Sequence, residues 1–313
     1  MSTALTDHYR SCDLCPHECG VNRCKGEVGI CGASDELVLG RAALHWWEEP
    51  CLVGEQGSGA VFFSHCSLKC VYCQNYELAH GRGIKITQDR LRDIFLELQN
   101  DQGAANLNLV TPTQYLPQIV ETLKELKGNG AHAGKLNIPV VYNTSGYERA
   151  EIIRALDGLV DIYLTDYKYA SADLAHNLSK AKKYPEVALE AIDEMLRQVG
   201  APSFDEKTGL LRKGVLVRHL ILPGHVEESC SAVRLLWQRF GKDILLSIMG
   251  QYTPLSSIDK LSQFGLDTVL APKEYEAVLS YADSLGIEDY FWQEGGSCEE
   301  SFIPAFDGQG VMA

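Results

Sequence analysis

Three closely spaced cysteines could bind a metal centre. Cys66, Cys70 and Cys73 have the spacing C-x3-C-x2-C, and thiolates at this spacing can surround one cubic iron–sulfur cluster. A closed [4Fe–4S] site requires four thiolates. With three, one iron keeps an open coordination position that a substrate or cofactor can occupy, as in catalytic metal sites. The motif therefore predicts an open [4Fe–4S] cluster.

Two other kinds of site use clustered cysteines. A structural zinc site would use a second C-x-x-C pair nearby, but the next cysteine after Cys73 is Cys230. A plant-type ferredoxin loop has the spacing C-x4-C-x2-C and a distant fourth cysteine, so it differs by one residue. Both alternatives fit the spacing less well than a catalytic cluster.

Composition limits the protein classes that need to be considered. The 313 residues include 28 Lys plus Arg and 42 Asp plus Glu, which gives a net charge of −14 and argues against a nucleic-acid partner. No apolar run approaches the roughly 18 residues of a membrane helix. Residues 1–8 lack the basic and apolar stretches of a secretory signal. We expect a cytoplasmic location, where clustered cysteines bind metals more often than they form disulfides.

Apolar strand-like runs alternate with helix-like segments from about Gly57 onward. The predicted strands are Ala60–Ser64, Leu107–Thr111, Pro139–Asn143, Asp161–Thr165, Gly214–Leu222 and Ile244–Met249. The predicted helices are Gln88–Asn100, Gln114–Leu126, Glu148–Leu156 and Pro185–Val199, and residues 168–213 are expected to contain helices of their own. This alternation predicts an α/β fold with six βα units, a partial (β/α)6 TIM-like barrel. Periodicity alone does not separate it from an open doubly wound sheet.

The chain divides into three predicted domains. Residues 1–35 form a cysteine-rich metal-binding extension, because such a stretch with little periodicity usually needs a metal to fold. Residues 36–55 connect it to the barrel and end in the unusual run Trp46-Trp47-Glu48-Glu49-Pro50. Residues 56–275 form the barrel and residues 276–313 a C-terminal extension.

The cysteine motif directly follows the first predicted strand, where catalytic loops of barrels lie. In spacing and position it resembles the motif of the radical S-adenosylmethionine (SAM) superfamily. The resemblance implies that the open iron is chelated by SAM, which is cleaved to methionine and a 5′-deoxyadenosyl radical that abstracts hydrogen from a substrate. The family carries an aromatic residue before its third cysteine, often near the adenine, and Tyr72 stands there.

Further segments narrow the resemblance to the pyruvate formate-lyase-activating-enzyme-like (PflX-type) radical SAM proteins. These segments are Gly57–Gly59, Phe62–Phe63, Cys73–Asn75, Asn108–Thr113, Tyr142–Tyr147 and Val217–His219. The similarity extends from Cys12 to about Pro254. It implies an oxidoreductase that activates a glycyl-radical enzyme, with a flavodoxin or ferredoxin as electron donor. The subfamily name itself rests on an analogy of fold.

Polar residues after the second and third predicted strands are candidates for SAM binding. Many radical SAM enzymes carry Gly-Gly-Glu after the second strand, but here Thr111-Pro112-Thr113 stands there. The SAM amino group is therefore unassigned, although Thr111 offers a hydroxyl and Thr113 could instead cap a helix. Asn143, Thr144 and Ser145 suit ribose hydroxyls or a carboxylate. The alternative for this segment is a turn at Ser145-Gly146.

Charged residues follow the fourth and fifth predicted strands. Asp166 and Lys168 are two residues apart in an extended segment, so both side chains should point into the barrel. The resemblance places a similar Asp-x-Lys pair near SAM, and a buried ion pair is the structural alternative. We favour Arg218 over His219 as the inward residue, because a guanidinium suits a carboxylate. Gln251 and Tyr252 are weaker candidates on the substrate side.

A second cysteine group precedes the barrel. Cys12, Cys15, Cys19 and Cys31 fit the family pattern Cys-x-Leu-Cys-Pro-x-x-Cys followed by Gly-x-x-Gly-x-Cys, and Cys24 is additional. Four thiolates suffice for a closed zinc site or for a second iron–sulfur cluster. The short spacings fit zinc slightly better, and an unmetallated segment is the third alternative. The segment could cap the barrel or shape the substrate entrance.

Two functional hypotheses follow. The first is a radical SAM enzyme whose substrate is a glycine of a partner protein, another peptide or a small metabolite. The second is a non-catalytic carrier of iron–sulfur clusters or zinc, which would supply a full set of ligands and would not cleave SAM. The three-cysteine motif and the polar strand ends favour the enzyme.

Overall fold

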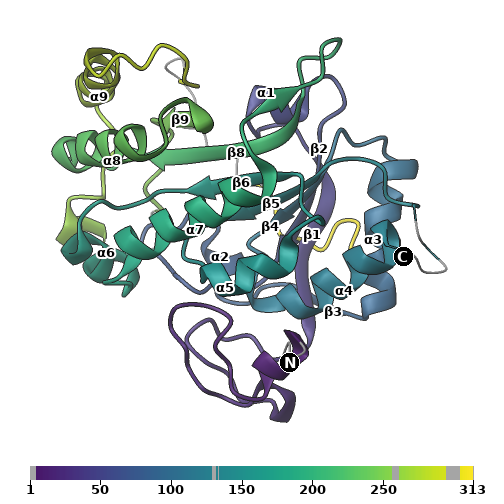
Figure 1. Ribbon diagram of the computed structural model, residues 1–313. Coiled ribbons are helices and arrows are strands. Elements are labelled where there is room, and N and C mark those ends of the chain that lie inside the picture. The colour runs from purple at the N-terminus through teal and green to yellow at the C-terminus, as the bar shows by residue number, and fades with distance from the viewer. Residues whose placement is uncertain (1–4, 129–131, 133, 256–260, 294–303, 313) are drawn as a thin grey trace.

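The computed structural model describes residues 5–128, 132, 134–255, 261–293 and 304–312, which form an α/β fold around one mostly parallel sheet (Figure 1). Six strands pair in parallel in chain order. They are β2 (Ser58–Phe63), β4 (Leu107–Val110), β5 (Val140–Thr144), β6 (Ile162–Asp166), β8 (Leu211–Leu220) and β9 (Leu245–Met249). All six predicted strands are therefore confirmed.

Three further strands extend the sheet. β1 (Leu37–His45) is antiparallel to β2, and the short β3 (Ile84–Ile86) pairs with β1. β7 (Ser203–Phe204) pairs with the amino-terminal part of β8. Sequence periodicity missed β1 because it falls in the expected connector. The strand order leaves β3 at one edge, with β7 and β9 at the other, so the described sheet is open. The curvature of a partial barrel stays a prediction.

Helices connect the parallel strands and cover the sheet. The longer ones are α3 (Gln88–Asn100), α4 (Leu116–Lys127), α6 (Ala172–Ser179), α7 (Tyr184–Val199), α8 (Val226–Phe240) and α9 (Pro272–Ser284). Short helices are α1 (Pro50–Val53), α2 (Tyr76–Ala79) and α5 (Ala150–Ile153). The four predicted helices and the helices expected within 168–213 are present. α9 runs across residue 275, where the barrel was expected to end, and the domain division itself stays a prediction.

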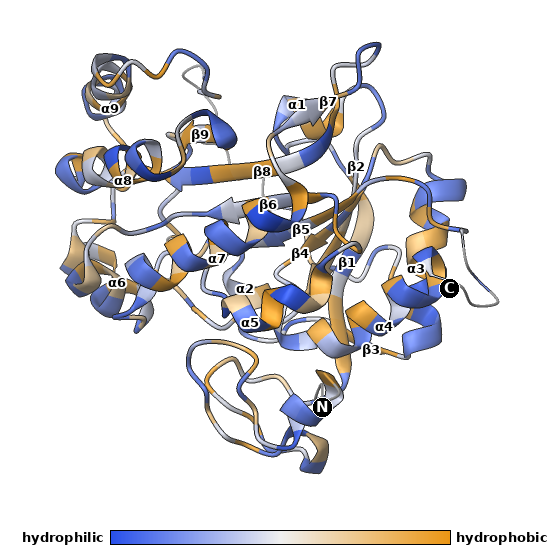
Figure 2. Cartoon of the chain, viewed as in Figure 1, coloured by the Kyte–Doolittle hydropathy of each residue, from blue (hydrophilic) through white to orange (hydrophobic). Residues whose placement is uncertain are grey.

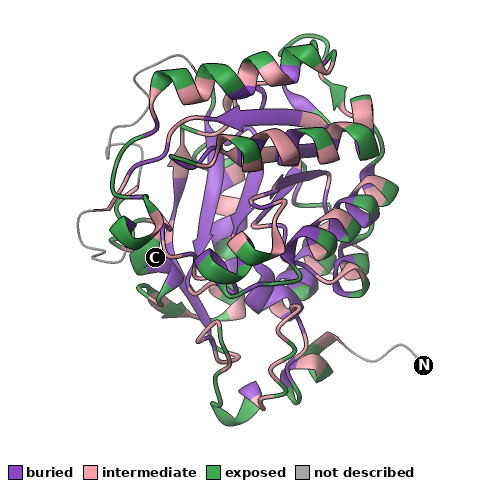
Figure 3. Ribbon diagram, turned by 90° about the vertical axis from the view of Figure 1, so that its left-hand side faces the viewer, coloured by how far each residue is buried: buried purple, intermediate pink, exposed green. Residues whose placement is uncertain are grey.

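The helices begin and bury their faces for local reasons. Thr87 and Ser171 accept hydrogen bonds from the first turns of α3 and α6, which satisfies free N–H groups there. Pro185 lies in the first turn of α7, where its missing N–H costs nothing. The longer helices bury apolar residues against the sheet or, for α9, against α8, and the central parallel strands are largely apolar and buried (Figures 2 and 3).

A second apolar cluster lies on the other face of the sheet. Cys51 and Leu52 of α1 pack there against Val141, Ile162 and Leu216, near the amino ends of their strands. Leu52 is only 1% exposed, and full burial of such a side chain contributes about 2 kcal/mol. α1 therefore covers this face of the sheet at the amino ends of the strands. Glu48 and Glu49 directly precede α1, and their carboxylates contact residues of the parallel strands on the same face.

No helix in the described part of the chain is long and apolar enough to cross a membrane.

Candidate functional site

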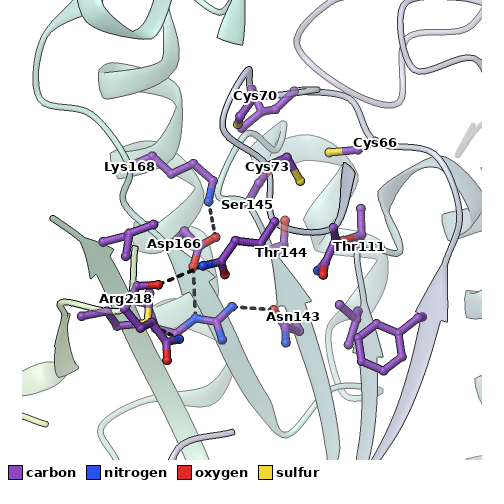
Figure 4. Close-up of a pocket in the computed structure, with 18 of the residues that line it drawn as sticks. Cys66, Cys70, Cys73, Thr111, Asn143, Thr144, Ser145, Asp166, Lys168 and Arg218 are labelled. Atoms are coloured by element: carbon purple, nitrogen blue, oxygen red, sulfur yellow. Dashed lines mark hydrogen bonds and ion pairs between the residues drawn. The ribbon is translucent and has the colours of Figure 1, made fainter. Parts of the chain in front are cut away.

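A cavity of about 240 Å³ lies at the carboxyl ends of the parallel strands (Figure 4). It is lined by Cys66, Cys70 and Cys73 together with all eight residues predicted from the sequence to bind SAM. Those eight are Tyr72, Thr111, Asn143, Thr144, Ser145, Asp166, Lys168 and Arg218. The structure thus brings the predicted set together at one place, and the role of each residue in binding stays a prediction.

The three cysteines lie on a coiled loop after β2. His65 and Lys69 have φ angles of 72° and 45°, so the backbone turns sharply on both sides of Cys66. Backbone N–H groups of Lys69 and Leu68 point to the Cys66 sulfur, and that of Asn75 to Cys73. The Ser179 hydroxyl donates to Cys70 Sγ at 3.0 Å. Three soft sulfur donors facing one cavity fit the iron–sulfur cluster expected from the spacing.

A chain of opposite charges runs from the cysteines to the floor of the cavity (Figure 4). Lys168 Nζ lies 2.6 Å from Asp166 Oδ2, and Arg218 Nε lies 3.1 Å from Asp166 Oδ1. Burial works to raise the pKa of Asp166, but Lys168 and Arg218 outweigh it and hold the pKa below its ordinary value. Asp166 therefore stays ionised, and the ion pair weighed as a structural alternative is present within the candidate site.

Glu48 completes this network, and sequence analysis did not select it. Its carboxylate contacts Arg218 Nη1 at 3.1 Å and accepts hydrogen bonds from Asn143 and Asn108, both at 3.1 Å. Arg218 Nη2 also donates to Asn143 Oδ1 at 2.9 Å. The only sequence signal was the unusual run Trp46–Pro50. Because two carboxylates already compensate the Arg218 charge, its availability for a SAM carboxylate is reduced.

Several alternatives weighed for neighbouring residues are resolved. Thr113 does not cap a helix, since its hydroxyl donates to the buried carboxylate of Glu148 at 2.5 Å. Gly146 has a φ of 79°, so the turn at Ser145-Gly146 exists while Ser145 also lines the cavity. Arg218 points into the cavity as predicted, and His219 is buried with Nδ1 2.7 Å from the Tyr167 carbonyl oxygen.

Of the two weaker candidates on the substrate side, only Gln251 lines the cavity. The Gln251 backbone carbonyl accepts a hydrogen bond from the side-chain amide of Gln74, which is next to Cys73. Tyr252 is instead buried, and its hydroxyl donates to the Leu266 carbonyl at 2.5 Å. Tyr252 also packs edge-on against Tyr72, so it supports the cavity wall from behind.

The cysteine-rich segment packs against the loop that carries the three cysteines. His17 Nε2 lies 2.9 Å from the Ser67 carbonyl oxygen, and the His17 ring meets Tyr147 edge-on. A Cβ at Gly32 would lie 3.2 Å from His65 Nδ1 and 3.3 Å from Lys69 Nζ. The segment therefore packs against the cysteine loop, and a role in capping the barrel or shaping the substrate entrance stays a prediction.

Comparison with known proteins agrees with this geometry. The model of the radical SAM superfamily matches residues 60–235, more than half of the chain. The chain belongs to the radical SAM superfamily. Membership in this superfamily implies an enzyme that uses SAM and a [4Fe–4S] cluster, and Cys66, Cys70 and Cys73 lie within the matched residues. The finer resemblance to activating enzymes stays a prediction.

Individual relatives of this radical SAM protein are distant. The uncharacterized protein MJ0674 of Methanocaldococcus jannaschii is 28% identical over 256 residues, covering 79% of this chain and 67% of that protein. Streptococcus suis SuiB bound to its precursor peptide SuiA has a TM-score of 0.47 and 13% identity over 73% of this chain. SuiB bound to S-adenosylmethionine has a TM-score of 0.48, 13% identity and 74% coverage. The chain spans about half of SuiB, 46% and 48% in these structures.

Proposed function

We propose that this protein is a radical SAM enzyme that abstracts a hydrogen atom from a glycine of a partner protein. The observation that carries the radical chemistry is the group of three thiols, without a fourth in the lining, facing a cavity with polar strand ends. The glycine substrate is supported by the sequence resemblance to glycyl-radical activating enzymes. A partial barrel in place of a flat open sheet, a cytoplasmic location, and a flavodoxin or ferredoxin as electron donor belong to the same proposal.

The residues that line the cavity have different proposed roles. Cys66, Cys70 and Cys73 line the cavity and would hold three irons of the cluster, which would leave one iron free of protein ligands. When bound there, the cluster and SAM supply a 5′-deoxyadenosyl radical by reductive cleavage. Asp166 and Lys168 present a fixed ion pair beside the cysteines, where they can orient the charged methionine end of SAM. Tyr72 supports the wall through its contact with Tyr169.

Anaerobic reconstitution tests the chemistry. Protein loaded with iron and sulfide is given dithionite and SAM, and 5′-deoxyadenosine is measured by chromatography. The double variant Cys70→Ala/Cys73→Ala should lose cavity iron and 5′-deoxyadenosine together. Cys230→Ala, on the half-buried side of α8, is the matched control and should retain both. If the double variant still cleaved SAM, the cysteine assignment would be wrong.

A second outcome would favour the cluster-carrier hypothesis. That outcome is an intact cluster whose electron paramagnetic resonance spectrum is unchanged by SAM, together with no 5′-deoxyadenosine. The substrate class is tested separately with partner proteins carrying α-deuterated glycine. Deuterium transfer into 5′-deoxyadenosine, with one SAM consumed per activated partner, supports glycine abstraction. SAM cleavage without such transfer points to another peptide or to a small metabolite.

A further inference from the structure

The four cysteines before the barrel are folded towards one another by tight turns. Cys12 N–H donates to the Val21 carbonyl at 2.9 Å, and Gly20 N–H donates back to the Cys12 carbonyl at 2.8 Å. This pairing places Cys12 beside Cys19, and Gly20 accommodates the turn with a φ of 68°. Cys15 begins a tight turn in which Glu18 N–H donates to its carbonyl at 3.0 Å, and Ile30, the residue before Cys31, lies with its N–H 3.5 Å from Cys19 Sγ. Backbone turns and pairing therefore bring the segments that carry the four thiols together.

Backbone N–H groups point at these sulfurs as they do at the cavity cysteines. His17 N–H is directed at Cys15, and Ala33 N–H lies 3.5 Å from Cys31 Sγ. Both donors come two residues after their cysteine. The same offset occurs where Leu68 N–H faces Cys66 and Asn75 N–H faces Cys73. Such hydrogen bonds stabilise metal-bound thiolates and tune their clusters.

A third cysteine of the group has a donor from another loop. Ile30 N–H lies 3.5 Å from Cys19 Sγ, and a Cβ at Gly29 would lie 2.7 Å from the same sulfur. Gly29 thus lets the backbone approach the thiol closely, and a side chain there would displace it. Cys24, the additional cysteine of the segment, is exposed and has no part in these contacts.

A buried cation beside the group lacks a counter-charge. Arg23 is 1% exposed, stacks over the Tyr9 ring at 4.2 Å, and donates to the Ser34 carbonyl oxygen. Within the described residues it makes no ion pair with a carboxylate. Its charge works to lower the pKa of Cys31. Because buried charges are normally paired, an anionic group is expected next to Arg23.

We propose that Cys12, Cys15, Cys19 and Cys31 bind a second [4Fe–4S] cluster, closed by four thiolates, whose negative charge compensates Arg23. No ligand is shared with the cavity, so this cluster forms whether or not the cavity performs the chemistry proposed above. Four thiolates leave no open iron, so this cluster does not bind SAM. It fastens the segment that His17 holds against the cysteine loop.

Zinc and a four-iron cluster require different distances between their thiolates. One zinc ion draws its thiolates to within about 3.8 Å of one another, because tetrahedral Zn–S bonds measure about 2.3 Å. A four-iron cluster binds each thiolate to a different iron and holds the sulfurs further apart. N–H donors two residues after Cys15 and Cys31 recur two residues after Cys66 and Cys73, the cysteines of the cluster motif, and this likeness favours a cluster here as well.

The variant Cys66→Ala/Cys70→Ala/Cys73→Ala isolates the second cluster. After anaerobic reconstitution it should keep about four irons and four sulfides per chain, half the wild-type content. Its reduced form should give an electron paramagnetic resonance signal that SAM does not change. Loss of all iron in this variant, with circular dichroism showing it folded, or one zinc per chain, would overturn the second cluster without touching the assignment of the first.

Substitutions in the segment give the complementary measurement. Cys19→Ala/Cys31→Ala should halve the iron content while the remaining signal still responds to SAM, which also shows that the barrel is folded. Cys24→Ala is the matched control and should keep the full content. Equal iron in the double variant and in this control would contradict the proposal.

Arg23 gives a readout that separates charge compensation from packing. In the triple-alanine background, Arg23→Gln should shift the midpoint potential of the second cluster to more negative values, because a nearby positive charge favours the reduced state. Arg23→Lys should restore much of the difference, and Arg10→Gln, at an exposed arginine, should leave the potential unchanged. An unchanged potential in Arg23→Gln would remove Arg23 from the proposal.

Discussion

Glu48 illustrates how a single residue can organise the cavity without touching the metal site. Its side chain is 8% exposed and binds Arg218, Asn143 and Asn108, which belong to three different strands. Its bond to Arg218 joins residues that are 170 positions apart in sequence. Removing one partner of a buried ion pair leaves the other charge uncompensated, and this usually costs more than the pair contributes.

Glu48→Gln should therefore lower the free energy of unfolding by about 3 kcal/mol. The new amide group faces donors and leaves Arg218 paired with Asp166 alone. Chemical denaturation measures this effect, and Glu206→Gln, at an exposed site that makes no ion pair within the described residues, should change stability by less than about 0.5 kcal/mol. Equal stabilities of the two variants would contradict the role of Glu48.

Glu148 is a buried carboxyl group behind the cavity. Burial raises its pKa from an ordinary 4.5 to about 7, and hydrogen bonds from Thr113 and Thr144 limit the increase. Between these two pH values the folded protein holds a proton that the unfolded chain releases. Stability contributed here is thus complete below about pH 4.5 and falls as the pH rises through about 7.

Wild-type protein should lose roughly 3 kcal/mol of stability relative to Glu148→Gln between about pH 5 and pH 8. The glutamine keeps the shape and has no proton to release. Urea denaturation at several pH values measures the difference. Glu121→Gln, at an exposed position of α4, should keep the wild-type slope. Parallel pH profiles for wild type and Glu148→Gln would show that Glu148 is ionised at all these pH values.

At the scale of elements, the ends of β5 and β6 approach each other so closely that only glycine fits between them. Gly146 follows β5 with a φ of 79°, and a Cβ there would collide with the Asp166 carbonyl oxygen and lie 3.1 Å from the Tyr184 hydroxyl. The same Tyr184 hydroxyl donates to the carbonyls of Ser145 and Asp166. These contacts of the Tyr184 hydroxyl set the spacing between Ser145 and Asp166 in the cavity wall.

Gly146→Ala should separate these strand ends and cost more than about 2 kcal/mol, because a backbone atom cannot move aside as a side chain can. Gly158→Ala is a matched control, since Gly158 has a φ of 75° but nothing within 4 Å of its Cβ position. It should cost only about 1 kcal/mol from the positive φ angle. Thermal unfolding and SAM binding measured on both variants distinguish the two effects, and equal losses would exclude a specific clash at Gly146.

For the whole molecule, the last described residues return to the beginning of the sheet. Ala42 N–H donates to the Gln309 carbonyl at 2.8 Å, and Gly308 N–H to the Gly40 carbonyl at 3.0 Å. The tail thus lies along β1, and Arg90 of α3 donates to the carbonyl of Val311. Residues near both ends of the chain support the same edge of the sheet.

Phe306 anchors this tail beside the cavity wall. It is 7% exposed and contacts Phe62, which lines the cavity, at a ring-centroid distance of 5.7 Å. Phe306→Ala should reduce stability by about 3 kcal/mol, through lost burial and the void left behind. Met312→Ala, at a residue that is 62% exposed, should change it by less than about 0.5 kcal/mol. Thermal unfolding measures both changes, and identical unfolding midpoints for Phe306→Ala and Met312→Ala would mean that Phe306 adds no stability.

The parallel strands, the principal helices and the three cavity cysteines could be predicted from the sequence alone. These features depend on local patterns: apolar runs of strand length, helical periodicity, and thiols a few residues apart. It also indicated which polar residues gather, because carboxyl ends of parallel strands meet at one edge. Asp166, Lys168 and Arg218 could be selected in this way although they come from two strands.

Contacts between segments that are distant in sequence depend on the tertiary fold. Glu48 reaches Arg218 because α1, which follows it, packs against the sheet. Thr113 reaches Glu148 because β4 and β5 are neighbouring strands. The isolation of Arg23 from any carboxylate in the described chain depends on the packing of Tyr9 and Tyr115 around it. Such contacts carry no local sequence signal, because their free energy comes from burial and charge pairing that exist only after the segments have met.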